Sequence, residues 1–375
     1  MPNQFKVCIV LNKPVVYSET FIKAHIDHLQ AKVYYATDLP SASVVLKRRG
    51  WTGQLRSFLK TAYTGATNRV KERQLFSFWQ QHKIDLVLAE YGGVGVGILP
   101  YCRKKNLPLV VHFHGYDAYR TTYLEKYKQD YSELFAYASA IIVVSKDMQE
   151  QIIRLGAPAS KVFYNVYGVE LDKFKRADVA QSQRQLFAAG RFVEKKAPYL
   201  TILAFQKVLE KMPDSRLVFA GEGELLDVCK KMVDSLRLSH AVSFCGSLPH
   251  EEISELMQRS RAFVQHSIVP ASGDSEGTPN TILEAQASAL PVVSTRHAGI
   301  KDVIVHERTG YLVAEGDIDT MASYMIDLLE HAGKAAMLGD AGRANVEARY
   351  SMESSIRNLR DILKSSLNRT VNFGA

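Results

Sequence analysis

Residues 272–294 read SGDSEGTPNTILEAQASALPVVS, a polar loop followed by a helix-forming run and a short apolar run. Asn280 is a suitable N-cap for the helix, and the apolar residues at 291–294 predict a buried strand. A loop that leads onto a helix N-terminus presents backbone N–H groups to an anion. Glu276 in the loop and Glu284 in the helix are placed to bind hydroxyls at two ends of one ligand. Taken alone, both glutamates are equally explained as solvent-exposed charges.

The same alternation of strand and helix extends outward from this stretch in both directions. Strands are predicted in the first half at residues 5–11, 33–35, 84–89, 107–112, 140–144 and 162–164, with helices such as 19–30 and 123–137 between them. In the second half they are predicted at residues 186–189, 216–220, 241–244, 262–265, 291–294 and 311–313. This pattern predicts an α/β protein with two Rossmann-like, doubly wound domains facing across a cleft.

The length of the chain also favours two domains. Its 375 residues exceed the size at which one hydrophobic core usually stops growing. A polar stretch at 177–185 is the best linker candidate, so we predict an N-terminal domain at 1–176 and a C-terminal domain at 186–354. Residues 355–375 are helical in pattern and are predicted to return to the first domain.

Composition excludes several classes of protein. Hydrophobic residues make up 46% and charged residues 23%, which is ordinary for a globular protein. The four cysteines show no metal-binding spacing and are expected to be buried free thiols. No apolar run is long enough for a signal peptide or a membrane span. Because no such run is present, a cytoplasmic location is expected.

The run GGVGVG at 92–97 lacks the dinucleotide-binding spacing and is predicted to form a tight turn before a helix.

Charge is distributed unevenly along the chain. Residues 1–176 carry 25 Lys+Arg against 14 Asp+Glu, a net +11, whereas residues 177–375 carry 22 against 25, a net −3. Residues 44–73 hold eight basic residues and one acidic residue, and part of this segment is amphipathic. It either lies on an anionic membrane surface or packs on the first domain with a solvated charged face. No nucleic-acid-binding motif accompanies the charge.

Two further elements follow predicted strands. The loop GRFVEKK at 190–196 places Arg191 and Lys196 where cations suit a diphosphate, while Lys195 is explained as a solvated residue paired with Glu194. The strand end VVHFHGYD at 110–117 carries His114 beside a glycine, where an imidazole can donate to a sugar hydroxyl.

Together, SEGTPNTILEAQASALPVVST, GIKDVIVHERTGYLV, GRFVEKK and HFHG resemble the retaining glycosyltransferases of the GT-B fold, specifically glycosyltransferase family four. The resemblance covers most of the chain and is closest to members that build bacterial exopolysaccharides. It implies a donor-binding C-terminal domain, an acceptor-binding N-terminal domain and no metal ion or other cofactor.

The resemblance also implies a role for each matching residue. Glu276 is expected to hold hydroxyls of the transferred sugar, Glu284 to bind the nucleotide ribose, and His114 to face the donor sugar. Arg191 and Lys196 are expected to neutralise the diphosphate. Other donor contacts are expected from Gly190, Gly277, Thr278, Asn280, Thr281 and Ile282, with Ser247 and Leu248 near the base.

These expectations combine into one function. The chain is predicted to transfer a sugar from a UDP- or GDP-sugar to a glycan or lipid-linked acceptor in cell-surface polysaccharide or glycolipid synthesis, in the cytoplasm or on the inner face of the membrane. The alternatives are a nucleotide-sugar-binding or scaffold protein without turnover, and a sugar phosphorylase or epimerase of the same architecture.

Overall fold

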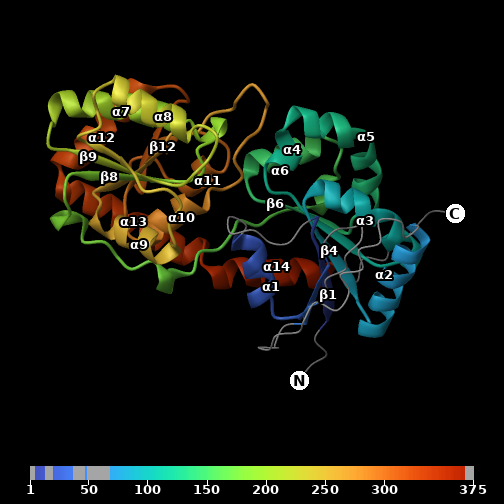
Figure 1. Ribbon diagram of the computed structural model, residues 1–375. Helices are drawn as coiled ribbons and strands as arrows, with labels where there is room; N and C mark the ends of the chain where they lie inside the picture. The colour runs from blue at the N-terminus through green and yellow to red at the C-terminus, as the bar shows by residue number, and fades with distance from the viewer. Residues whose placement is uncertain (1–4, 13–19, 37–46, 49–67, 368–375) are drawn as a thin grey trace. The chain divides into compact units, whose positions relative to one another are not determined.

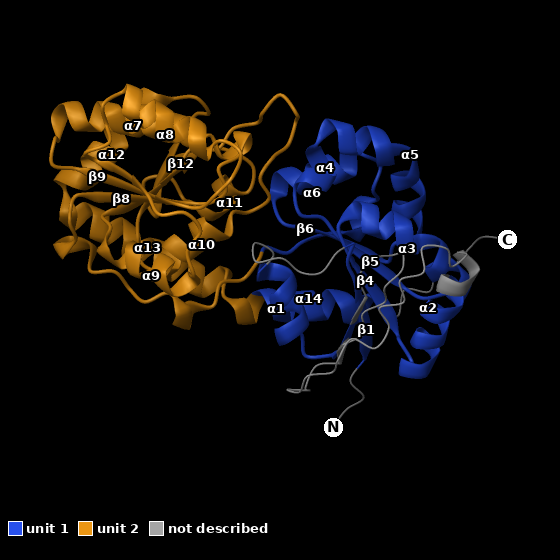
Figure 2. Ribbon diagram, in the orientation of Figure 1, with its two compact units in different colours: residues 1–166, 355–375 blue, residues 167–354 orange. Residues whose placement is uncertain are grey.

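The computed structural model describes residues 5–12, 20–36, 47–48 and 68–367. It divides into two compact units, one of residues 1–166 with 355–375 and one of residues 167–354 (Figure 2). The second unit thus begins ahead of the predicted linker at 177–185, which lies inside it. Val179 in that stretch is buried, and the Ala177 amide donates to the Ser288 carbonyl at 2.8 Å, so the stretch packs onto the second unit.

The first unit is built on a seven-stranded sheet in the order β3-β2-β1-β4-β5-β6-β7. All neighbouring strands are parallel except β3, which pairs antiparallel with β2. The described strands are β1 Lys6–Val10, β2 Lys32–Ala36, β3 Lys47–Arg48, β4 Leu86–Glu90, β5 Leu109–His112, β6 Ala140–Val143 and β7 Val162–Tyr164. Its helices are α1 Thr20–His28, α2 Asn68–His82, α3 Gly92–Lys105, α4 Tyr116–Tyr119, α5 Thr121–Tyr137 and α6 Lys146–Arg154.

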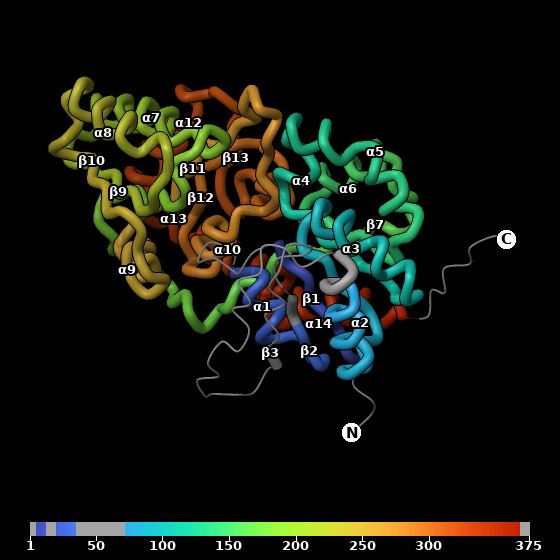
Figure 3. Tube along the Cα trace, turned by 45° about the vertical axis from the view of Figure 1, so that its right-hand side comes forward, coloured from blue at the N-terminus to red at the C-terminus, as the bar shows by residue number. Residues whose placement is uncertain are grey.

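The C-terminal helix α14, Met352–Leu367, runs into this unit from residue 355. The Ser355 hydroxyl donates to the Val166 carbonyl at 2.7 Å, and Arg360 donates to the Gln30 side chain that follows α1. Figures 1 and 3 show α14 beside β1, so segments from opposite ends of the chain lie together.

The second unit holds a fully parallel six-stranded sheet in the order β10-β9-β8-β11-β12-β13. Its strands are β8 Gln185–Ala189, β9 Arg216–Ala220, β10 Val242–Phe244, β11 Ala262–Gln265, β12 Val292–Thr295 and β13 Gly310–Val313. Its helices are α7 Pro198–Lys211, α8 Leu226–Ser235, α9 His250–Arg259, α10 Asn280–Ala287, α11 Ile300–Val303, α12 Ile318–Glu330 and α13 Ala332–Arg349. Helices α7, α8 and α12 cover one face, and α9, α10 and α13 cover the other (Figure 1).

The predicted α/β class is confirmed, and each predicted strand matches an observed one to within two residues at either end. Because helices cover both faces, strands such as β4 and β5 are buried at every position and are apolar up to their last residues, Glu90 and His112. The strand β3 was not predicted; it lies in the basic segment 44–73, most of which falls outside the described residues.

Two local predictions were wrong. The glycine run 92–97 forms the first turns of α3 rather than a tight turn. A Cβ at Gly92 would lie 2.3 Å from the Tyr131 hydroxyl of α5. The glycine there permits close packing of α3 against α5.

The second wrong prediction concerns a cysteine. Cys245 is exposed, whereas Cys8, Cys102 and Cys229 are buried free thiols as expected. Among the described helices, none combines the length and apolar character needed to cross a membrane.

Candidate active site

The loop after β8 packs against the loop after β9 at a position that only glycine can occupy. Gly221 has φ +132°, and a Cβ there would lie 2.0 Å from the Gly190 carbonyl oxygen. The Gly190 amide donates to the Ala220 carbonyl at 3.0 Å, and the Phe192 amide donates to the Glu222 carbonyl at 2.9 Å. These contacts bind the loop after β8 to the loop after β9, so the segment that carries Arg191 has a fixed path.

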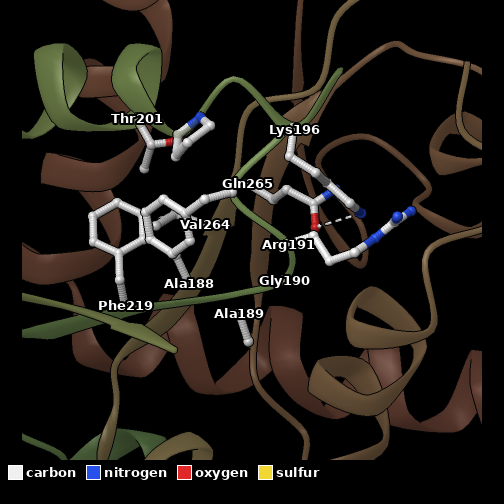
Figure 4. A pocket seen from close by; sticks show the side chains of 11 residues that line it. Ala188, Ala189, Gly190, Arg191, Lys196, Thr201, Phe219, Val264 and Gln265 are labelled. Carbon is white, nitrogen blue, oxygen red and sulfur yellow. Dashed lines mark hydrogen bonds between the residues drawn. The ribbon is translucent and has the colours of Figure 1, made fainter. Parts of the chain in front are cut away.

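A pocket opens at the carboxyl end of β8. Figure 4 shows its lining, with the side chains of Arg191 and Lys196 extending in the same direction. Arg191 is exposed, and its side chain makes no hydrogen bond or ion pair with any described residue. The lining consists of Ala188, Ala189, Gly190, Arg191, Phe192, Lys196, Pro198, Thr201, Phe219, Val264 and Gln265.

Gln265, the last residue of β11, connects the pocket to helix α10. Its Oε1 accepts from Lys196 Nζ and from the Thr281 hydroxyl, each at 3.3 Å, while its Nε2 donates to Ser267 at 2.9 Å. The amide therefore fixes Lys196 and the start of α10 relative to each other. Sequence analysis did not select Gln265 as a site residue; a polar residue that ends a buried strand was the available signal.

Glu276 is buried beside Lys196, with 3.3 Å between its Oε1 and Lys196 Nζ. Burial alone would raise the pKa of the Glu276 carboxyl, but the positive charges of Lys196 and Lys195 outweigh it and lower that pKa to about 2. Glu276 is therefore a buried carboxylate that stays ionised at physiological pH. Burial also lowers the pKa of Lys196, and the neighbouring cations Lys195 and Arg191 add to this effect while Glu276 opposes it.

Lys195 differs from its predicted state. It is buried, not solvated, and its Nζ lies 3.1 Å from Asp274 Oδ2 rather than pairing with Glu194. It also donates to the Ser275 carbonyl at 3.3 Å. Lys195 thus holds the loop that carries Glu276.

His297 supports the same loop from the other side. The Glu276 amide donates to His297 Nε2 at 3.2 Å, so His297 Nδ1 carries the proton and donates to Glu315 Oε1 at 2.6 Å. Sequence analysis missed both His297 and Glu315. They follow strands β12 and β13, and only the pairing of those strands brings them to the Glu276 loop.

Helix α10 begins at Asn280, and Pro279 occupies the position that was predicted for Asn280 as N-cap. Proline fits there because the first turn of a helix leaves N–H groups without intrahelical partners. In the preceding loop, the Gly277 carbonyl accepts from the Gly299 amide at 3.0 Å. Loop and helix together bring the predicted donor contacts into one segment, namely Gly277, Thr278, Asn280, Thr281, Ile282 and Glu284.

Glu284 is buried, which excludes the alternative of an exposed helix charge. Its carboxyl makes no hydrogen bond or ion pair with any residue that the structure describes. Burial raises its pKa to about 7. An unpartnered buried carboxyl is costly for a protein to keep, so a ligand that supplies hydrogen-bond donors is its natural complement.

The predicted base region follows β10. Ser247 is exposed and Leu248 is half-buried. The Gly246 carbonyl accepts from the Gly221 amide at 2.7 Å, which brings this segment beside the loop after β9.

His114, in the first unit, follows β5. Its Nε2 lies 2.8 Å from Glu90 Oε2, and its ring contacts the ring of Tyr91. The Asp117 carboxylate accepts from the amides of His114 and Gly115 at 3.0 Å and of Gly92 at 2.9 Å, which fixes the path of this loop.

His25, Glu90 and His112 bring potential metal-ligand atoms within 4.8 Å of one another, all of them buried. Both Glu90 oxygens already lie within hydrogen-bonding distance of imidazole nitrogens, those of His25 and His114. Burial lowers the pKa of His112 to about 3, so this ring is neutral. The group is accounted for as a hydrogen-bonded cluster, and sequence analysis identified neither Glu90 nor His25.

The fold and this geometry define a class: a two-unit α/β protein whose second unit has a pocket lined by Arg191 and Lys196, with the buried Glu276 beside Lys196. Two family models match the chain, Glycosyl transferases group 1 over residues 170–345 and Glycosyltransferase Family 4 over residues 44–173. The chain belongs to the glycosyltransferases of the GT-B fold that these models describe.

Relatives of known sequence agree with this assignment. The chain is 32% identical over 257 residues to the amylovoran biosynthesis glycosyltransferase AmsK of Erwinia amylovora, a match over 68% of this chain and 63% of AmsK. It is 25% identical over 291 residues to the putative colanic acid biosynthesis glycosyltransferase WcaL of Escherichia coli, over 76% of this chain and 71% of WcaL.

Solved structures share the fold. A glycosyltransferase from Rickettsia africae superposes with a TM-score of 0.76 at 17% identity, covering 98% of this chain and 100% of that one. Anabaena HepE, solved in complex with UDP and glucose, gives a TM-score of 0.75 at 16% identity, covering 97% and 100%.

Proposed function

We propose that the chain is a retaining, metal-independent glycosyltransferase that moves a sugar from a UDP- or GDP-sugar to a glycan or lipid-linked acceptor. The observation that carries the proposal is Glu276, a buried carboxylate kept ionised by Lys196 at the edge of the pocket. A protein retains such a group at considerable cost, and it suits a task that needs a fixed negative charge beside a fixed positive one.

The donor is proposed to lie along the segment from Gly190 to α10. Arg191 and Lys196 neutralise its diphosphate, and amides at the start of α10 add their N–H groups. Glu276 accepts hydrogen bonds from hydroxyls of the transferred sugar. Glu284 accepts from the ribose hydroxyls, and the base lies at Ser247 and Leu248. HepE, a protein of the same fold, was solved with UDP and glucose, which supports a nucleotide-sugar donor here.

In the proposed reaction the bond between the anomeric carbon and the β-phosphate oxygen breaks, and its electron pair leaves with the diphosphate. The acceptor hydroxyl oxygen bonds to the same carbon from the same face and gives its proton to the leaving phosphate oxygen. Arg191 and Lys196 stabilise the negative charge that develops there, the task that a metal ion performs in other enzymes. His114 forms a hydrogen bond with the sugar while the bond between the sugar and the diphosphate breaks.

The acceptor is proposed from the relatives and from the sequence. AmsK and WcaL are named for exopolysaccharide synthesis, and a Corynebacterium glutamicum relative, 30% identical over 177 residues, is a GDP-mannose-dependent mannosyltransferase acting on a phosphatidylinositol mannoside. Both kinds of acceptor fit cell-surface polysaccharide or glycolipid synthesis. We further propose that the basic segment 44–73 contacts an anionic membrane surface on the cytoplasmic side.

The test is a panel of UDP- and GDP-sugars with lipid-linked and oligosaccharide acceptors, scored by release of nucleoside diphosphate, with and without EDTA. We expect release from one donor at a rate that EDTA leaves unchanged, and a product whose anomeric configuration by NMR matches the donor. No release from any donor would contradict the transferase activity, whereas loss of release in EDTA or an inverted anomer would contradict the proposed mechanism.

A further inference from the structure

Glu90 ends strand β4, whose other residues, Leu86 to Ala89, are all apolar. Its side chain is completely buried in the first unit. A buried carboxylate is tolerated only where charged or hydrogen-bonding partners compensate for the lost water. The partners of Glu90 therefore indicate what the residue does.

Three imidazoles surround this carboxylate. Glu90 Oε1 lies 2.8 Å from His25 Nδ1, and Glu90 Oε2 lies 2.8 Å from His114 Nε2. His112 Nδ1 lies 3.4 Å from Oε2, and the His112 ring stacks on His25 with centroids 5.3 Å apart. One carboxylate thus bridges His25 of α1 and His114, which follows β5.

This bridge determines which nitrogens carry protons. Burial would raise the pKa of Glu90, but the histidines outweigh it and hold that pKa well below its usual value. An ionised carboxylate only accepts hydrogen bonds, so His25 Nδ1 and His114 Nε2 both donate to it. A neutral His114 ring then carries its lone pair on Nδ1.

The backbone around Glu90 is shaped to hold His114 in place. Tyr91, the next residue, has φ +80°, a conformation that costs a non-glycine residue free energy. Its ring lies against His114 with centroids 4.6 Å apart, and Phe21 contacts the same imidazole at 4.5 Å. The imidazole is therefore restrained both by its hydrogen bond to Glu90 and by two aromatic rings.

We propose that Glu90 and His25 are positioning residues for His114: the carboxylate bridges the two imidazoles and fixes the ring and tautomer that His114 presents to the sugar. This inference rests on the proposed function, in which His114 contacts the transferred sugar. Through His114, the carboxylate adds a fixed negative charge behind the imidazole, which favours positive charge on the ring as the sugar–phosphate bond breaks.

The first experiment needs no turnover. Imidazole ¹⁵N NMR of the wild-type protein, with His114→Gln used to assign the signals, is expected to show His114 protonated at Nε2 and bonded through it. The variant Glu90→Gln is expected to shift these signals. A wild-type His114 that carries its proton only on Nδ1 would overturn the proposal, even if the enzyme is fully active.

The second experiment is a double-mutant cycle on sugar transfer. Glu90→Gln is expected to lower kcat roughly 10- to 100-fold with donor KM nearly unchanged, and to change kcat less than about twofold in a His114→Ala background. The conservative His25→Gln, which keeps an N–H donor, is expected to retain more activity than His25→Leu. Glu133→Gln, an exposed carboxylate of the same unit, serves as the matched control.

Additive losses in the cycle, with Glu90→Gln equally harmful whether or not His114 is present, would overturn the proposal, since a purely structural carboxylate acts independently of His114. If Glu90→Gln does not fold, the variants His25→Gln and His25→Leu, each combined with His114→Ala, provide the same cycle. Full activity of His114→Ala alone would instead contradict the role given to His114 in the proposed function, while the NMR result still decides its positioning by Glu90.

Discussion

The loop before α10 and the helix itself each bury one glutamate, and the two carboxyls are held in opposite ways. Glu276 lies 3.3 Å from Lys196, and its pKa is lowered to about 2. Glu284, eight residues later, has no hydrogen-bond or ion-pair partner among the described residues, and burial raises its pKa to about 7. The protein supplies the partner of one carboxylate, and in the proposed function the ribose of the donor supplies the partner of the other.

This difference separates two tasks within one motif. A group that acts on the transferred sugar needs its charge in place before the donor binds, because preorganised charge stabilises a transition state without further reorganisation. A group that recognises ribose gains specificity if its hydrogen bonds form only in the complex. In the proposed function, the same local sequence combines a preorganised carboxylate, Glu276, with a recognition residue, Glu284, whose hydrogen bonds form only when the donor binds.

The largest effect on kcat is expected from removing the negative charge of Glu276. Glu276→Gln keeps the shape of the side chain and is expected to lower kcat roughly 100- to 1,000-fold, in the range found when one preorganised transition-state contact is lost. Binding of UDP or GDP is expected to persist because the diphosphate contacts remain. Initial rates and calorimetric titration measure the two quantities. Glu255→Gln, an exposed carboxylate on α9, is the control, and equal loss in both variants would contradict the comparison.

The next largest effect is expected from removing a positive charge of the site, that of Arg191. Arg191→Ala is expected to lower kcat roughly 10- to 100-fold while leaving the melting temperature unchanged, because the guanidinium acts on charge formed in the transition state. The side chain is exposed and makes no hydrogen bond or ion pair with a described residue, so the fold does not depend on it. Arg191→Lys is expected to recover part of the rate. Wild-type turnover in the alanine variant would remove Arg191 from the site.

The sequence predicted the sheets well because parallel strands covered on both faces are mostly apolar, as β6 is throughout and β4 and β5 are up to their last residue. It also selected Glu276 and Lys196, which lie in loops that follow strands. The supporting residues could not be predicted in the same way. His297 contacts the Glu276 loop from 21 positions away, and His25 contacts Glu90 from 65 positions away. Such pairs are defined by strand order and helix placement, which local patterns do not contain.

Glu284 gives the most direct test of the account, through the protons released when a nucleotide binds. In the empty site its raised pKa leaves the carboxyl largely protonated below pH 7, whereas ribose hydroxyls favour the charged form and would lower that pKa. Binding should therefore expel a proton from Glu284, and affinity should rise with pH between about 6 and 8. Calorimetry of UDP and GDP binding in buffers of different ionisation enthalpy measures the number of protons released.

At pH 6.5 the wild type is expected to release roughly 0.7 proton more than Glu284→Gln, and at pH 8.5 the difference should nearly vanish. The comparison between the two proteins cancels protons that come from the nucleotide phosphate or from Lys196. Equal proton release at pH 6.5 by wild type and variant would contradict the claim that Glu284 is the carboxyl left for the nucleotide to complete.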